Sequence, residues 1–280
     1  MTAPTGRHTP LMTLFCCDID GTLLNSHRTL SPRTIAAIRA VREAGHTFVL
    51  CSSRMPESMA ALDRLSGGTG VPLIAYNGAL VLRDDRSVAT DEHIAAADAR
   101  VAYDTCARLG LHGSFFAGDA WYAWANDRWT QREINHTAVE PSTESAHDYA
   151  APSRIEAEPP HKVMGMGDAH LVDELERVLA GREGLVTYRS KATYLEVASA
   201  ECSKGAGVRS IAADLGIDLA DTVFYGDNDN DLSAFAVVGT SVAVANAKPY
   251  VLEAASEVTG PHHADGVAAH LEDWLGLNPA

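Results

Sequence analysis

Short runs of consecutive apolar residues mark the first third of the chain, and each run ends at polar side chains. The runs cover residues 13–17, 46–51 and 72–76. Uninterrupted apolar runs of this length are typical of strands that are buried on both faces of a sheet. Two further runs of the same kind, 222–225 and 241–244, occur far downstream. The pattern therefore predicts five buried strands in two widely separated parts of the chain.

Segments with helical spacing separate these strands. Ser31 supplies an N-cap directly before a proline, and Ile35, Ile38 and Val41 recur at helical spacing behind it. Further helices are expected at 56–65, 204–215, 231–237, 249–255 and 266–275. Strands that alternate with helices form parallel sheets. We therefore expect an α/β fold with a doubly wound, Rossmann-like parallel-sheet core.

The middle of the chain has a different pattern. It holds a helix-like segment (93–109), an alternating aromatic segment that predicts a hairpin (114–128), a polar, proline-bearing stretch expected to be loop-rich (140–160), and a strand, helix and strand at 161–166, 168–180 and 185–189. This arrangement predicts an inserted α/β cap domain at residues 87–191. The discontinuous core would comprise residues 11–86 and 192–280, and residues 1–10 would form a flexible N-terminal tail.

Composition excludes several classes of function. The chain carries 22 Lys and Arg against 37 Asp and Glu, a formal net charge of −15, which argues against a nucleic-acid or membrane-surface partner. No apolar run approaches the roughly 20 residues of a membrane span, and the first ten residues lack the apolar segment of a signal peptide. The five cysteines form no CxxC pair, and we expect buried free thiols in the cytoplasm.

The polar residues that follow the predicted strands form the candidate site, because ligands bind at the carboxyl ends of strands in open parallel sheets. Asp18 and Asp20 follow the first strand, and Asp227, Asp229 and Asp231 lie in the segment GDNDND after the fourth. Other strand ends, and the helix before the fourth strand, supply Ser52, Ser53, Arg54, Asn77, Lys204 and Asn246. Carboxylates converging from two strands repel one another unless a hard divalent cation binds them. Mg²⁺ suits such a site because it also keeps positions for water and phosphate.

Each part of this set has a simpler interpretation when it is taken alone. An Asp-X-Asp pair after a strand is often a turn, GDNDND could be an Asx-rich turn, and Lys204 could be a solvated surface lysine. An EF-hand calcium loop fails because Leu232 and Val238 stand where Gly and Glu are needed. The joint occurrence of these residues at strand ends of one sheet is what favours a catalytic site.

These segments resemble the haloacid dehalogenase superfamily, in particular its Cof-type phosphatases with an inserted α/β cap (class IIB). The resemblance rests on DIDGTLLNS at 18–26, SSR at 52–54, YNGA at 76–79, SKG at 203–205, GDNDNDLSAF at 226–235, VANA at 244–247 and ADGVAAHL at 264–271. The motifs occur in the family's order and span nearly the whole chain. The resemblance implies a Mg²⁺-dependent hydrolase that acts on a small phosphorylated metabolite.

The resemblance also implies a role for each matching residue. Asp18 would be the nucleophile that forms an aspartyl-phosphate, and Asp20 would be the general acid and base. Lys204 would balance charge on Asp18 and on the transferring phosphoryl group. The implied phosphate-binding residues are Gly21, Ser52, Ser53 and Lys204; the implied metal ligands are Asp18, Asp20 through its carbonyl, Asp227 and Asp231; the implied supporting residues are Arg54, Asn77, Asn230 and Asn246.

Three features depart from the family's pattern: the second motif, the segment LSAF at 232–235, which replaces a more usual Met-Leu ending and is expected to change only packing, and Asp229. The second motif usually reads Thr-Gly-Arg, and here it is Ser52-Ser53-Arg54. Serine retains the hydroxyl, but Ser53 places a side chain where glycine allows close approach. Asp229 is an additional acid in the metal loop, and we expect it to face solvent or to orient a neighbour.

The substrate and the exact reaction stay open at the level of sequence. Trp121, Tyr122 and Trp124 could contact a sugar or a planar ring of the substrate, although aromatic residues of a small domain more often form its own core. A phosphotransferase or phosphomutase of the phosphomannomutase type is the alternative reaction, and a non-catalytic sugar-phosphate-binding protein is a third reading. Both a monomer and a homodimer are compatible with the sequence.

Overall fold

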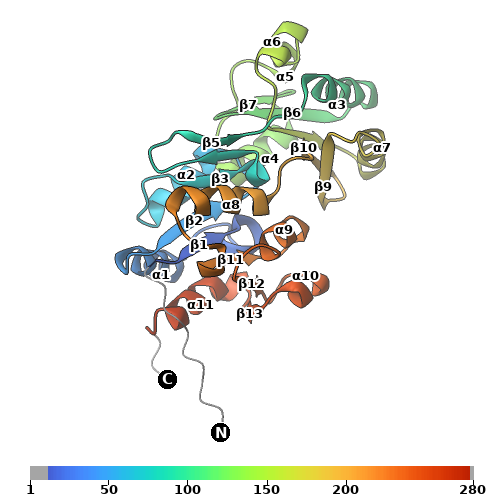
Figure 1. Cartoon of the computed structure of the whole chain (residues 1–280). Helices are drawn as coiled ribbons and strands as arrows, with labels where there is room; N and C mark the ends of the chain where they lie inside the picture. The colour runs from blue at the N-terminus through green and yellow to red at the C-terminus, as the bar shows by residue number, and fades with distance from the viewer. Residues whose placement is uncertain (1–11, 278–280) are drawn as a thin grey trace.

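The larger of two sheets forms the lower part of the molecule in Figure 1, a computed structural model that describes residues 12–277. Its eight strands lie in the order β13 (Glu257–Thr259), β12 (Thr240–Val244), β11 (Thr222–Gly226), β1 (Leu14–Cys17), β2 (Thr47–Cys51), β3 (Leu73–Ala75), β4 (Leu80–Leu82) and β5 (Val88–Asp91). Neighbours from β13 to β3 are parallel, and β4 and β5 extend the sheet as antiparallel strands. The α/β fold with a parallel-sheet core is confirmed.

Helices cover both faces of this sheet. One face packs against α1 (Pro32–Glu43), α2 (Pro56–Leu65) and α11 (Gly266–Trp274), and the other against α8 (Lys204–Leu215), α9 (Leu232–Phe235) and α10 (Pro249–Ala254). Side chains of β1 alternate between the faces: Phe15 packs with Ile38 and Leu271, whereas Leu14 packs with Ile211. Short helical turns complete the core at η1 (Ile19–Leu23), η2 (Tyr76–Gly78), η3 (Leu219–Asp221), η4 (Asp229–Asp231) and η5 (His262–Ala264).

A second sheet lies above the first in Figure 1 and forms the cap. Its five antiparallel strands lie in the order β7 (Ala120–Ala123), β6 (His112–Ala117), β8 (Lys162–Met166), β10 (Tyr194–Ser199) and β9 (Leu185–Lys191). One face packs against α3 (Ala96–Leu109) and α7 (Ala169–Leu179). The cap also contains α4 (Arg128–Thr137), α5 (Ala146–Tyr149) and α6 (Pro152–Ala157). Met164, Met166 and Tyr194 of the cap belong to the same apolar cluster as the core residues beneath them.

The chain changes from one sheet to the other at points that differ from those expected. β5 falls within the expected cap at 87–191, yet it pairs with β4 in the large sheet. β10 falls within the expected core segment 192–280, yet it pairs with β8 and β9 in the cap sheet. Strand pairing depends on distant partners that apolar periodicity does not reveal. The expected tail, residues 1–10, lies outside the described residues.

The predicted elements of the core are confirmed more closely than those of the cap. All five predicted strands are present, and the helices expected at 56–65 and 204–215 have those bounds. The expected helix 231–237 is shorter, since only η4 and α9 form there. The predicted hairpin ends at Ala123, because the Asp127 side chain accepts hydrogen bonds from the backbone N–H groups of Trp129 and Thr130 and so begins α4. The expected loop 140–160 contains α5 and α6.

The cysteines and the lengths of the helices can be compared with what the composition predicted. All five cysteines are free thiols and are buried. Among residues 12–277, the helices are all too short or too polar to cross a membrane.

Candidate active site

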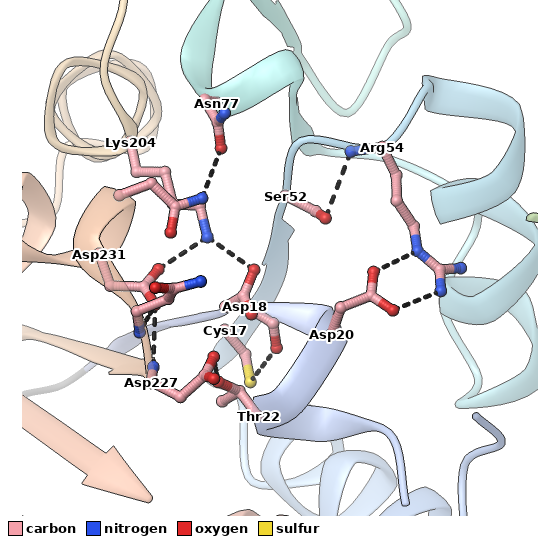
Figure 2. Close-up of polar contacts among 12 residues, drawn as sticks. Cys17, Asp18, Asp20, Thr22, Ser52, Arg54, Asn77, Lys204, Asp227 and Asp231 are labelled. Carbon is pink, nitrogen blue, oxygen red and sulfur yellow. Dashed lines mark hydrogen bonds and ion pairs between the residues drawn. The ribbon is translucent and has the colours of Figure 1, made fainter. Parts of the chain in front are cut away.

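The carboxyl ends of β1, β2 and β11 bring predicted site residues to one edge of the large sheet. β1 pairs in parallel with both β11 and β2, so Asp18, Ser52 and Asp227 each follow a strand at the same edge (Figure 2). Cys17, the last residue of β1, lies opposite Tyr225 of β11 and Leu50 of β2, so the three strands end at nearly the same level. The convergence that the strand ends predicted is therefore present.

Lys204 connects the aspartate that follows β1 to the loop that follows β11. Its Nζ donates to Asp18 Oδ1 at 2.6 Å and to Asp231 Oδ1 at 2.7 Å (Figure 2). Lys204 is the first residue of α8, whose N-cap Ser203 accepts a hydrogen bond from the Ala206 N–H. Lys204 is 1% exposed and Asp231 is 0% exposed. Because breaking a buried ion pair leaves a costly unpaired charge, these contacts hold the Asp18 side chain in a fixed position.

The two acids Asp227 and Asp231 of the turn after β11 have different partners. Asp231 Oδ2 accepts hydrogen bonds from the backbone N–H groups of Asp227 and Asn228 at 2.8 and 2.9 Å. Both carboxylate oxygens of Asp231 are thus engaged, one by Lys204 and one by the turn. Asp227 Oδ1 accepts from Thr22 Oγ1 at 2.9 Å. Asp231 therefore braces the loop and leaves the Asp227 carboxylate turned toward Thr22 and the end of β1.

Two carboxylate oxygens in this cluster accept no hydrogen bond from any described residue: Asp18 Oδ2 and Asp227 Oδ2. Asp18, Asp227 and Asp231 each offer an oxygen, and these atoms lie within 4.8 Å of one another. Gly21 has φ +90°, and a Cβ there would stand 2.5 Å from Asp227 Oδ2. The glycine keeps that oxygen clear, and a set of carboxylate oxygens fits a hard divalent cation such as Mg²⁺.

Charge in the cluster is only partly compensated by protein groups. Burial raises the pKa of the Asp18 carboxyl well above its usual range, against the opposing effect of Lys204. Burial and the neighbouring Asp231 raise the pKa of Asp227 to about 6. Burial alone would lower the pKa of the Lys204 ammonium, but Asp18 and Asp231 raise it well above its usual value. One ammonium facing three carboxylates leaves room for a further positive charge.

Asp20 points away from this cluster, toward arginines. Its carboxylate accepts from Arg54 Nε at 2.7 Å and from Arg54 Nη2 at 2.9 Å, a two-pronged contact (Figure 2). Arg28 Nη2 donates to the same carboxylate at 2.6 Å. Burial would raise the pKa of Asp20, but the Arg54 and Arg28 guanidinium groups hold it below its usual value. The two aspartates of the first motif therefore lie in opposite electrostatic environments.

The second motif lies between these two environments. Ser52 is buried, and its Oγ accepts from the Arg54 backbone N–H at 3.3 Å. The Ser53 carbonyl accepts from Lys162 Nζ at 2.9 Å. Ser52 and Ser53 both line the cavity that Asp18 and Asp20 also line. The side chain of Ser53, where the family's pattern has glycine, is therefore accommodated at the cavity wall.

The supporting asparagines connect loops rather than charged groups. Asn230 Nδ2 donates to Asn77 Oδ1 at 2.9 Å, so it contacts the turn η2 that follows β3. Asn246 Nδ2 donates to the Gly21 carbonyl at 2.8 Å. The first bond ties the loop after β11 to the loop after β3, and the second ties the loop after β12 to the loop after β1.

A cavity of about 530 Å³ lies between the core site and the cap. Its core wall includes Asp18, Asp20 and Ser52, and its cap wall includes Glu133, Lys162 and Tyr194. Sequence reasoning missed all three cap residues. A lysine inside the apolar strand KVMGM was the available signal, since lysine is rarely buried without a specific contact. Glu133 lies on α4, which the alternating aromatic pattern concealed.

The aromatic residues proposed as substrate contacts do not line this cavity. Trp121 is buried and stacks on Phe116, and Tyr122 is buried and stacks on Tyr149. Trp124 packs at the edge of the apolar cluster that α3 and α7 cover. Of the two roles that the sequence left open, these side chains have the more common one: they pack within apolar clusters of the cap, because a thin two-layer domain needs bulky apolar residues.

Asp229, the additional acid of the GDNDND loop, also has its own partners. Its carboxylate contacts Lys248 Nζ and the Tyr250 hydroxyl on the exposed rim of the loop. These two partners hold the pKa of Asp229 below its usual value, against the opposing effect of burial. Asp229 therefore orients neighbouring side chains, one of the two outcomes that the sequence analysis allowed.

Comparison with known proteins finds a matching family, relatives in sequence and a similar solved structure. Residues 15–271 match the family model of the haloacid dehalogenase-like hydrolases. A Bacillus subtilis protein named "Putative phosphatase YxeH" is 31% identical over 94% of this chain and 98% of its own length. A Haemophilus influenzae protein named "Putative phosphatase" is 30% identical over 91% of this chain and 95% of its own. The crystal structure of TM0651 from Thermotoga maritima superposes with a TM-score of 0.82 at 26% identity, covering 94% of this chain and 97% of that one.

Proposed function

We propose that this chain, which belongs to the haloacid dehalogenase-like hydrolases, is a Mg²⁺-dependent phosphatase of small phosphorylated metabolites. The observation that carries the proposal is the state of Asp18. One oxygen of its carboxylate is held by the buried Lys204 ammonium, and the other is free at the wall of the cavity. A fixed carboxylate with a free oxygen suits in-line attack on phosphorus.

In this mechanism Asp18 Oδ2 attacks the phosphorus atom, and the bond between phosphorus and the leaving oxygen breaks. The product is an aspartyl-phosphate on Asp18, which water then hydrolyses to release inorganic phosphate. Lys204 stays bound to Asp18 Oδ1 and compensates negative charge on the transferring group. Ser52 Oγ can donate to a phosphoryl oxygen, because its own proton is not used in the contact with the Arg54 N–H.

Asp20 would move the protons of both steps. It would donate a proton to the leaving oxygen and then take one from the attacking water. The two-pronged contact with Arg54 fixes the position of its carboxylate at the cavity wall. Arg54 is thus proposed as a positioning residue that acts through Asp20.

The metal would be held by Asp227 Oδ2, which has no hydrogen-bond donor among residues 12–277, and by the Asp18 carboxylate through Oδ1, whose second lone pair is not used by Lys204. Asp18 Oδ2 would then stay available for the attack on phosphorus. Asp231 would brace the loop through both of its oxygens. Bound Mg²⁺ would supply charge compensation for the carboxylates and for the phosphoryl oxygens. Both curated relatives carry the name "Putative phosphatase", which supports the same reaction. Buried unpaired cysteines support a reducing compartment such as the cytoplasm.

The proposal is tested by phosphate release from a panel of phosphomonoesters in Mg²⁺ buffer. The panel comprises para-nitrophenyl phosphate, sugar phosphates, nucleotides, flavin mononucleotide and pyridoxal phosphate. We expect free phosphate without any added sugar acceptor, which distinguishes hydrolysis from phosphoryl transfer between sugars. If none of the compounds in the panel releases phosphate, the proposal is overturned.

A further inference from the structure

The turn η1, which carries Asp20 and Gly21, does not have regular helical geometry. Asp20 has φ −88° and ψ 112°, and Gly21 has φ +90°. A turn of this kind lacks the continuous ladder of backbone hydrogen bonds that holds a helix in shape. The Leu24 N–H donates to the Ile19 carbonyl at 3.0 Å and closes the turn. Contacts from other elements therefore contribute to the position of Asp20 and Gly21.

Two carbonyl groups of this region accept hydrogen bonds from side chains that lie far downstream in the chain. Asn246 Nδ2, in the loop after β12, donates to the Gly21 carbonyl at 2.8 Å. His262 Nδ1, in η5 after β13, donates to the Leu24 carbonyl at 2.7 Å. Because a carbonyl oxygen only accepts hydrogen bonds, this contact assigns a proton to His262 Nδ1. His262 is therefore a hydrogen-bond donor to the end of the turn.

His262 also orients the side chain of Asn246. The His262 backbone N–H donates to Asn246 Oδ1 at 2.8 Å. An amide that accepts through Oδ1 on one side presents Nδ2 on the other side, and here Nδ2 faces Gly21. The Ala264 N–H donates to the Pro261 carbonyl at 2.9 Å and closes η5 around His262. One residue thus supports the η1 turn in two ways, directly and through Asn246.

The same residue lies near the acid that the proposed metal site uses. Burial raises the pKa of Asp227, and the charge of His262 acts in the opposite direction. Since the interaction between charges weakens with distance, the His262 ring lies close to the Asp227 carboxylate. Gly21 lies against this carboxylate as well, because a Cβ there would stand 2.5 Å from Asp227 Oδ2. A small shift of Gly21 would therefore obstruct that oxygen.

We propose that His262 is a positioning residue that holds the η1 turn through the Leu24 carbonyl and through Asn246. The turn, held in this place, leaves Asp227 Oδ2 open to Mg²⁺ and keeps Asp20 at the cavity wall. His262 itself would contact neither the substrate nor the metal. This inference rests on the proposed phosphatase function.

The test measures the Kd of Mg²⁺ alone by isothermal titration calorimetry. His262→Leu removes the donor to Leu24, so Kd should rise by about fivefold, the usual effect of losing one hydrogen bond. With saturating Mg²⁺, kcat for para-nitrophenyl phosphate should fall by a similar factor at little change in KM, because Asp20 is also displaced. In His262→Asn the amide can donate to the same carbonyl, so both values should stay within about twofold of the wild type. The matched control is His263→Leu, since the exposed His263 side chain has no hydrogen bond or ion pair with any of residues 12–277.

Melting temperatures separate this role from a purely structural one. If His262→Leu melts at a lower temperature but keeps the wild-type Kd and kcat, His262 only supports the fold and the inference is overturned. If His262→Asn is impaired as strongly as His262→Leu, the hydrogen bond to Leu24 is not the cause, which also overturns it. A wild-type protein that neither binds Mg²⁺ nor hydrolyses any ester would instead refute the proposed phosphatase function.

Discussion

The two walls of one cavity differ in how their charges are partnered. On the core wall, Lys204 binds Asp18 and Asp231, and Arg54 binds Asp20 through two nitrogens. On the cap wall, the Glu133 carboxylate and the Tyr194 hydroxyl have no partner among the described residues. The acids of the core wall are thus held in place by ion pairs, whereas the Glu133 carboxylate on the cap wall is not. The proposed function accordingly assigns the reaction to the core wall.

Removal of divalent metal should have the largest effect on the core wall. After treatment with EDTA and dialysis, phosphatase activity should fall to background, and Mg²⁺ should restore it, because charge in the acidic cluster is otherwise uncompensated. Mg²⁺ should also raise the melting temperature of the wild-type protein, and should do so much less in Asp227→Asn. Full activity in excess EDTA would refute the metal assignment.

Loss of the buried ammonium should be the next largest effect. Lys204→Met should lower kcat by about 10²- to 10³-fold, since a preorganised charge near the phosphoryl group is removed. It should also lower the free energy of unfolding by about 3 kcal/mol, because buried Asp18 and Asp231 lose their partner. Steady-state kinetics and urea denaturation measure the two effects. A variant with wild-type kcat would show that Lys204 only supports the fold.

A smaller effect is expected where Arg54 holds Asp20. Arg54→Lys keeps the charge but cannot make the two-pronged contact, so kcat should fall by about tenfold. KM for para-nitrophenyl phosphate should change little, because Arg54 is proposed to act through Asp20. The matched control is Arg83→Lys, because Arg83 is a partly exposed arginine paired with Asp214 and neither residue lines the cavity. A rise in KM with unchanged kcat would make Arg54 a substrate-binding residue instead.

The smallest expected effect is the pH dependence of stability that Glu133 introduces on the cap wall. Its folded-state pKa is raised by burial and by neighbouring Glu196 and Asp20, against the opposing charges of Lys162 and Arg54. Stability from the protonated form is present below the unfolded pKa of about 4.3 and is lost as pH rises through the folded pKa. Glu133→Gln should therefore be more stable than the wild type by about 1 kcal/mol at pH 8, and by less at pH 5. Denaturation at the two pH values tests this, and a constant difference would contradict it.

The core could be predicted from the sequence because its strands and helices give clear local signals, which those of the cap do not. Buried parallel strands are continuous apolar runs, and Asp18, Ser52 and Asp227 follow their ends, so a simple rule about sheet edges located the residues. The bounds of α2 and α8 were also correct, helped by the proline and serine at their starts. Local signals and the global fold agreed there.

In the cap, the same sequence pattern is compatible with more than one structure. The alternating segment 114–128 holds both a hairpin and the start of α4, so the helix that carries Glu133 was missed. Trp121 and Tyr122 could have lined a pocket or filled a core, and only packing decided in favour of the core. Pairing of Asp20 with Arg54, and of Asn230 with Asn77, depends on side-chain directions that residue spacing does not determine.

The central claim is that Asp18 is the nucleophile of the core wall, and Asp18→Asn tests it most directly. The matched control is Asp229→Asn, which removes an acid of the neighbouring loop whose partners are Lys248 and Tyr250. With para-nitrophenyl phosphate and saturating Mg²⁺, we expect Asp18→Asn to lower kcat by at least about 10³-fold. Asp229→Asn should stay within about twofold of the wild type, as exposed ion pairs contribute little. A rate for Asp18→Asn close to that of the wild type would contradict the account.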